Sequence, residues 1–151
     1  MSADDSPTVA PAAATIEQVV DIGAPPELVY ELWTTAEGLA RWWGRAVLLD
    51  ATPGGAIHVD LGPPVMIGEF VTLDPPHRLV FRFGWNMPTP DGDLPPSSTI
   101  VDVRIEPTPT GSRVILRHHG LPGVHRAGHA LGWRIFLGRM AAATPGAGNA
   151  C

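Results

Sequence analysis

The sequence predicts an α+β fold, in which a curved antiparallel sheet wraps around one long C-terminal helix. Three observations predict it. Strand-like runs follow one another through residues 45–119, and turn residues such as Gly, Pro and Asp separate them. Two short helical patterns precede these runs. A single long helical pattern, at residues 124–143, follows them.

The first elements form a strand and two short helices. Residues 15–22 predict a strand whose apolar side chains share one face: Ile16, Val20 and Ile22. Pro25-Pro26-Glu27 then starts a helix, because proline is tolerated in the first turn and an early acid suits the helix dipole. This helix places on one stripe Leu28, Leu32 and Trp33. A second helix, residues 36–42, follows two threonines that are candidate caps.

Six strands make up the middle of the chain. They are predicted at residues 45–50, 56–61, 65–73, 78–85, 99–106 and 112–119. Pro53-Gly54-Gly55 is a turn between the first two, as a hairpin requires. Val101 and Val103 alternate with charged residues in the fifth run, which is the period of a strand with one buried face. Consecutive strands joined by short turns predict an antiparallel sheet.

Composition limits the class of protein. The chain has 151 residues, which predicts one domain with a real core, at residues 15–143. Residues 1–14 and 144–151 are too poor in large apolar groups to pack, so we expect a disordered N-terminal tail and a flexible C-terminal tail. The net charge of −5 argues against a nucleic-acid partner, which would need a basic face.

The chain also lacks the signals of membrane insertion and secretion. No apolar run approaches the length of a membrane span, and the N-terminus has no charged segment followed by an apolar one. The single cysteine, Cys151, leaves no partner for an internal disulfide. We therefore expect a cytoplasmic protein without a membrane partner.

A series of motifs identifies a family resemblance. In chain order they are Leu28–Gly44 (LVYELWTTAEGLARWWG), Pro53-Gly54-Gly55, Gly68-Glu69-Phe70, Leu73–Phe81, His118–Pro122 and Gly132-Trp133. In this order and spacing they resemble the AHSA1-like (activator of Hsp90 ATPase homologue-like) branch of the SRPBCC, or Bet v 1/START, superfamily. The resemblance covers about residues 15–143 and implies the helix-grip fold. It does not name a function, because helix-grip cavities host ligand carriers, cyclases and co-chaperone modules alike.

The fold implies a space between sheet and helix that side chains or a ligand must fill. At 100° per residue, one face of the last helix carries His125, Arg126, His129, Trp133, Phe136, Leu137 and Met140. The polar members come first, which predicts a pocket with one polar and one apolar end; alternatively, they lie at a solvated helix start. We predict a ligand-binding set of Trp42, Trp43, Phe70, Phe81, Phe83, Trp85, Val101, Val103, Leu116, His118, His125, Arg126, His129, Trp133, Phe136 and Met140.

Four of the six histidines cluster at residues 118–129. His125 and His129 are four apart, the spacing at which a helix presents two metal ligands, and His118 points toward the same region. HRAGH lacks the glutamate of HExxH, so we predict no metal and no cofactor. Histidine titrates near neutrality, which makes His118 and His129 candidate catalytic groups together with Glu69. Glu69 is otherwise an exposed strand residue.

Two further features concern the mouth of the pocket. Trp42 and Trp43 point about 100° apart on a helix, so we expect one to be buried and the other to cap the pocket or form an exposed patch. The proline-rich loop at residues 86–97 is too long for a tight hairpin. It is either a lid over the cavity or a surface loop without a role.

Three functions follow from these features. The first is a protein that binds a small apolar or aromatic molecule between sheet and C-terminal helix. The second is a cofactor-independent cyclase, dehydratase or lyase of polyketide-like secondary metabolism that uses a pocket histidine. The third, implied by the family name, is an Hsp90-type co-chaperone module. A homodimer through a strand edge or Trp42 and Trp43 is compatible with each.

Overall fold

The computed structural model describes residues 15–144. Its elements, in chain order, are β1 (Ile16–Ile22), α1 (Pro26–Thr34), α2 (Ala36–Trp42), β2 (Arg45–Leu49), β3 (Ala56–Asp60), β4 (Val65–Asp74), β5 (Arg78–Phe83), β6 (Thr99–Thr108), β7 (Gly111–His119) and α3 (Gly123–Ala143). Every predicted element is present, and the predicted α+β helix-grip fold is confirmed. The predictions about residues 1–14, about most of 144–151 and about Cys151 lie outside the described residues.

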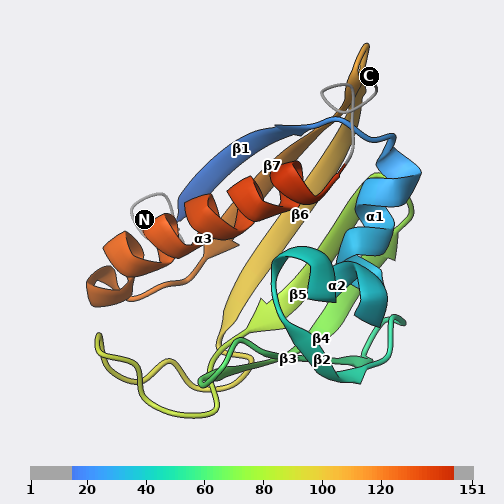
Figure 1. Cartoon of the computed structure of the whole chain (residues 1–151). Helices are drawn as coiled ribbons and strands as arrows, with labels where there is room; N and C mark the ends of the chain where they lie inside the picture. The colour runs from blue at the N-terminus through green and yellow to red at the C-terminus, as the bar shows by residue number, and fades with distance from the viewer. Residues whose placement is uncertain (1–14, 145–151) are drawn as a thin grey trace, which may run out of the picture.

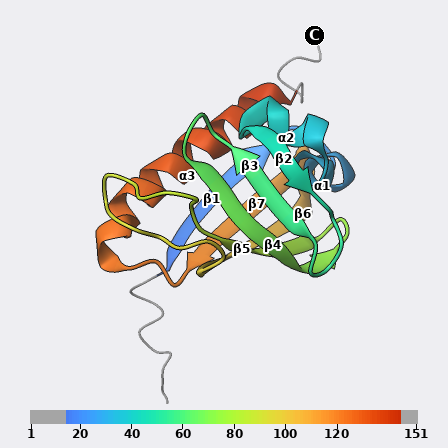
Figure 2. The same cartoon turned by 90° about the horizontal axis from the view of Figure 1, so that it is seen from below.

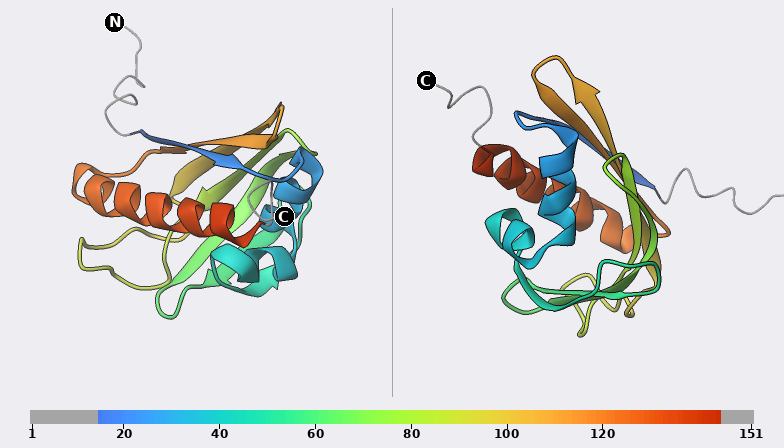
Figure 3. Two further views of the ribbon diagram at one scale, coloured as in Figure 1. Left: turned by 45° about the horizontal axis from the view of Figure 1, so that its top comes forward. Right: turned by 90° about the vertical axis from the view of Figure 1, so that its right-hand side faces the viewer.

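The seven strands form one antiparallel sheet in the order β1-β7-β6-β5-β4-β3-β2. Strands β2 to β7 follow one another as a meander, and β1 returns to pair with β7. Register shifts at Ala46/Leu48 and Phe70/Thr72 interrupt two of the ladders. Such irregularities bend a strand and increase its twist. The sheet curves around α3, which lies across its concave face (Figures 1 and 3).

Helices α1 and α2 close one end of the concave side (Figures 2 and 3). Thr35 caps α2 as predicted, since its hydroxyl accepts from the Gly38 amide at 2.9 Å. The predicted apolar stripe of α1 was wrong at one position. Leu28 is 52% exposed, whereas Val29 is buried with Leu32 and Trp33. The buried stripe of a helix covers only about a third of its circumference. Two neighbouring residues, such as Leu28 and Val29, can therefore lie on opposite sides of its boundary.

Both Trp42 and Trp43 are buried, at 2% and 5% exposure. The prediction that only one of them would be buried was wrong. Its premise, a shared helix, does not hold, because α2 ends at Trp42 and Trp43 is its C-cap with φ −111° and ψ −62°. The two indoles stack at a centroid distance of 5.2 Å, and Trp42 donates from Nε1 to the Leu32 carbonyl at 2.8 Å.

Helix α3 has one buried stripe, formed by His125, Trp133, Leu137 and Met140. His129 and Phe136 are half-buried beside it. Arg126 is exposed, because it lies in the first turn and a guanidinium is costly to remove from water. None of the helices within residues 15–144 is long and apolar enough to cross a membrane.

Candidate functional site

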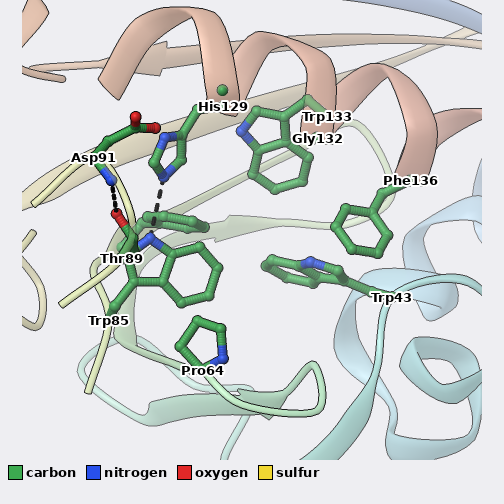
Figure 4. Close-up of a pocket in the computed structure, with 11 residues that line it drawn as sticks. Trp43, Pro64, Trp85, Thr89, Asp91, His129, Gly132, Trp133 and Phe136 are labelled. Atoms are coloured by element: carbon green, nitrogen blue, oxygen red, sulfur yellow. Dashed lines mark hydrogen bonds between the residues drawn. The ribbon is translucent and has the colours of Figure 1, made fainter. Parts of the chain in front are cut away.

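A cavity of about 250 Å³ opens between the N-terminal half of α3 and the end of strand β5 (Figure 4). Its walls come from five places: α3, the end of α2, strand β5, the β3–β4 turn and the loop after β5. The lining residues are Trp43, Pro64, Phe83, Trp85, Thr89, Asp91, Gly128, His129, Gly132, Trp133 and Phe136. Five of these eleven side chains are aromatic, so the wall is mainly flat and apolar.

The cavity has a polar end and an apolar end. Figure 4 shows Thr89, Asp91 and His129 together on one side. Trp43 and Phe136 lie together on the other side, with Trp133 between the two groups. The polarity therefore changes along α3 from its N-terminal half toward its middle, in the direction that the helix pattern predicts.

The loop at residues 86–97 forms one wall of the cavity. Its Leu94 is buried, and the Leu94 carbonyl accepts from the Trp85 amide at 2.8 Å. His125 fixes the loop to α3 by donating from Nε2 to the Asp93 carbonyl at 2.9 Å. Thr89 and Asp91 reach the cavity from the same loop. The loop thus lies against the site rather than apart from it.

His118 is fully buried, and both of its ring nitrogens are bonded. Trp133 donates from Nε1 to His118 Nδ1 at 2.9 Å, so the proton of the neutral ring is on Nε2. Nε2 then donates to Thr99 Oγ1 at 2.8 Å, and that hydroxyl donates to the Phe83 carbonyl, also at 2.8 Å. The chain of donors is complete. His118 ties β7, β6, β5 and α3 together inside the core and does not line the cavity.

His129 does line the cavity, and its ring nitrogens are bonded as well. Trp85 donates from Nε1 to His129 Nε2 at 3.1 Å. Nδ1 therefore carries the proton, and it donates to the His125 carbonyl one turn earlier at 2.8 Å. The ring is held with its edge against Trp85, as the dashed line in Figure 4 shows.

Burial keeps both imidazoles neutral. It lowers the pKa of His118 well below the ordinary value of 6.5, and the neighbouring His129 lowers it further. Burial also lowers the pKa of His129, although the bond to the His125 carbonyl and the charge of Asp91 oppose that change. At neutral pH both rings therefore act as hydrogen-bond acceptors for an indole.

Of the predicted ligand-binding residues, six line the cavity: Trp43, Phe83, Trp85, His129, Trp133 and Phe136. Others are packed in the core without reaching it: Trp42, Phe70, Phe81, Val101, Val103, Leu116, His118, His125 and Met140. Arg126 is exposed and lies outside the lining residues. Sequence reasoning missed five lining residues: Pro64, Thr89, Asp91, Gly128 and Gly132. Two glycines four apart in a helical pattern are the signal that marks part of this wall.

Glu69 is not at the site. It alternates with the buried Gly68 and Phe70 and lies on the opposite face of β4, half exposed, with its carboxylate 4.0 Å from the Arg82 guanidinium. Both side chains of this pair are on the outside of the sheet, so Glu69 cannot exchange a proton with His118 or His129.

The three histidines considered as metal ligands do meet. The ring centroid of His129 lies 5.7 Å from that of His118 and 5.4 Å from that of His125. Both ring nitrogens of His118 and His129, however, are directed at Trp, Thr and carbonyl partners, and Nε2 of His125 at the Asp93 carbonyl. Nδ1 of His125 is buried without a hydrogen-bond partner. Over residues 15–144, no group of three His, Cys, Asp or Glu side chains is placed to hold a metal ion.

Comparison with known proteins adds the family. The model of the family described as activator of Hsp90 ATPase homolog 1-like protein matches residues 23–144. The chain belongs to this AHSA1-like family. No curated protein sequence matches this AHSA1-like protein.

Solved structures resemble this AHSA1-like protein in fold. Protein MLL2253 from Mesorhizobium loti is 22% identical with a TM-score of 0.73, covering 85% of this chain and 95% of that one. DynU16, a putative protein in the dynemicin biosynthetic locus, is 24% identical with a TM-score of 0.72, covering 85% of this chain and 46% of DynU16. The Aha1 dimer from Colwellia psychrerythraea is 22% identical with a TM-score of 0.68, covering 85% and 94%. At these identities the likeness concerns the fold.

Proposed function

We propose that this protein binds a small apolar or aromatic molecule in the cavity between α3 and the loop at residues 86–97. The observation that carries the proposal is the wall itself, in which five aromatic rings surround about 250 Å³. Concave sites with mainly apolar walls and a few polar groups are typical of small-molecule binding. An empty apolar cavity also costs stability, and a ligand that fills it recovers those contacts.

A cofactor-independent cyclase, dehydratase or lyase is the second candidate, and one observation favours it. His129 lines the cavity beside the Asp91 carboxylate, where an acid–base group would be needed (Figure 4). Yet Trp85 and the His125 carbonyl already bond both nitrogens of His129. A proton transfer would have to break one of these bonds first. We therefore rank binding above catalysis.

The binding test uses two matched glycines of α3. Gly132 lines the cavity, and an added Cβ there meets open space, whereas Gly138 is exposed on the same helix and also has no atom near an added Cβ. Gly132→Leu should fill the cavity and abolish binding of a naphthalene-type probe. Quenching of tryptophan fluorescence measures this binding. Gly138→Leu should bind as the wild type does. Equal binding by both variants would place the probe elsewhere and overturn the proposal.

The same proposal includes a single ligand-binding domain at residues 15–143 and a cytoplasmic location. It also includes assembly as a homodimer, for which the Aha1 dimer of the same fold is a precedent. Sedimentation of the full chain at several concentrations tests the assembly. A mass that stays at one chain throughout would remove the homodimer from the proposal.

A further inference from the structure

Asp91 is a charged group at the cavity with no charged partner. It lies in the loop after β5 and lines the polar end of the site. Five ion pairs are present within residues 15–144, and none includes Asp91. Asp102 on the sheet, by contrast, is paired with Arg78 at 2.9 Å. The carboxylate of Asp91 is therefore available to a ligand.

The fold holds this carboxylate in place. Thr89 and Gly92 exchange two backbone hydrogen bonds, of 3.0 and 2.9 Å, and the Asp91 amide donates to Thr89 Oγ1 at 3.1 Å. The tight turn directs Asp91 toward α3. There its Oδ2 comes within 2.8 Å of the point where a Cβ on Gly128 would lie. Only a residue without a side chain lets the carboxylate approach the helix this closely.

The aromatic walls have the same electrostatic preference as the carboxylate. The faces of Trp, Tyr and Phe rings carry negative potential and attract cations, and indoles attract them most strongly. Three of the lining rings are indoles: Trp43, Trp85 and Trp133. No Arg or Lys is among the lining residues, and His129 is a neutral acceptor. The lining residues therefore offer an anionic ligand no cationic side chain, whereas a cation would meet a carboxylate and three indole rings.

We propose that the ligand carries a positively charged amino group on its apolar or aromatic body, with the amino group directed at Asp91 and the body between the rings. This inference rests on the proposed binding function and specifies its ligand class. It follows from the unpaired carboxylate at one end and the indole-rich wall at the other.

Asp91 also has a purely structural explanation. Helix α3 has no acidic residue in its first turn, and a carboxylate near its N-terminal half complements the helix dipole. In that case Asp91→Asn would lower the stability of the protein without changing which probe it prefers. The experiment must therefore compare probes within one variant.

The test uses three probes with one ring system: 2-naphthylmethylamine, which is cationic at pH 7, 2-naphthylmethanol, which is neutral, and 2-naphthoate, which is anionic. Dissociation constants are measured by calorimetry with the wild-type chain and Asp91→Asn. Asp93→Asn is the matched control, because Asp93 is in the same loop but is not among the lining residues. We expect the wild type and Asp93→Asn to prefer the amine over the alcohol by about tenfold or more. In Asp91→Asn the ratio of the dissociation constants of the alcohol and the amine should fall toward one, while the affinity for the alcohol stays unchanged.

The outcomes separate this inference from the function on which it rests. If the alcohol binds, and Gly132→Leu abolishes its binding, but the amine shows no preference, the cationic ligand class is wrong and the binding function stands. If none of the three probes binds, both are overturned. A preference for the amine that survives in Asp91→Asn would also overturn the role of Asp91. Because Asp91 is exposed, the preference should shrink as salt rises from about 0.02 to about 0.5 M.

Discussion

The indole of Trp133 donates from Nε1 to Nδ1 of His118 at 2.9 Å, which joins helix α3 to strand β7 inside the core. A second indole–imidazole bond runs in the opposite direction, from Trp85 after β5 to His129 on α3 at 3.1 Å. One pair is in the core and the other is in the wall of the cavity. Together they fix α3 to the sheet beside the site and leave the histidines no free nitrogen.

The first prediction separates the packing of Trp133 from its hydrogen bond. Trp133→Ala removes a buried indole and should lower the free energy of unfolding by about 3–5 kcal/mol. Trp133→Phe keeps much of the ring but leaves His118 Nδ1 unpaired, which should cost about 1–3 kcal/mol. Both are measured by urea denaturation.

Ile135 supplies the control for that series. It is on the same helix and 48% exposed, so Ile135→Ala should change the free energy of unfolding by about 0.5 kcal/mol or less. A Trp133→Ala variant as stable as Ile135→Ala would mean that the indole does not pack against the sheet.

The second prediction concerns Thr99, whose hydroxyl connects His118 to the Phe83 carbonyl. Thr99→Val keeps the shape of the side chain but removes the acceptor of the buried His118 Nε2–H and one donor to the Phe83 carbonyl. We expect a loss of about 1–3 kcal/mol in the free energy of unfolding. Thr110→Val, at an exposed position, is the matched control. Equal effects of the two changes would show that the buried chain of hydrogen bonds contributes nothing.

The fold followed from patterns that depend on backbone periodicity and turn chemistry. Val101 and Val103 on β6 alternate as a half-buried strand must, and the Pro53-Gly54-Gly55 turn joins β2 to β3. Such signals are local, so a single sequence contains them. The same reasoning failed at Leu28 and Trp43, where the outcome depends on the phase of a short helix or on the residue at which it ends.

The candidate site was less accessible to prediction because it depends on tertiary contacts. Two of the three residues of the polar end, Thr89 and Asp91, are in a loop without periodicity. The role of His118 depends on which ring nitrogen faces Trp133, and no sequence pattern carries that information. Alternation along β4 placed Glu69 and Phe70 on opposite faces of the sheet, but it did not show which face is concave.

The third prediction uses Gly138, an exposed glycine in the interior of α3 with no atom within 4 Å of an added Cβ. Gly138→Ala should raise the free energy of unfolding by about 0.5–1 kcal/mol, because alanine has a higher helix propensity and restricts the unfolded chain. Thermal denaturation monitored by circular dichroism measures it. A lower melting temperature would indicate that this surface of α3 is covered in the folded protein.

The fourth prediction is that acid destabilises the protein from about pH 6.5 downward. The unfolded histidines titrate near 6.5, whereas burial lowers the pKa of His118 and His129 in the folded state. Below that pH the unfolded chain therefore binds more protons than the folded one, and the free energy of unfolding falls as pH falls. Above it both states are neutral at these positions, and they add no pH dependence. Urea denaturation at about pH 8, 7, 6 and 5 measures the free energy of unfolding across this range.

A variant of His129 tests whether this histidine contributes to the loss of stability in acid. His129→Gln removes one of the two imidazoles whose pKa is lowered in the folded state, so the loss of stability between about pH 6.5 and pH 5 should be smaller than in the wild type. The groups that face His129 are His118, His125 and Asp91, and all three are retained. His77→Gln, at an exposed turn position, should leave the wild-type pH dependence intact. If both variants show the same dependence of unfolding free energy on pH as the wild type, the protons are taken up at other groups. Protonation of His129, and loss of its hydrogen bond from Trp85, would then not explain the loss of stability in acid.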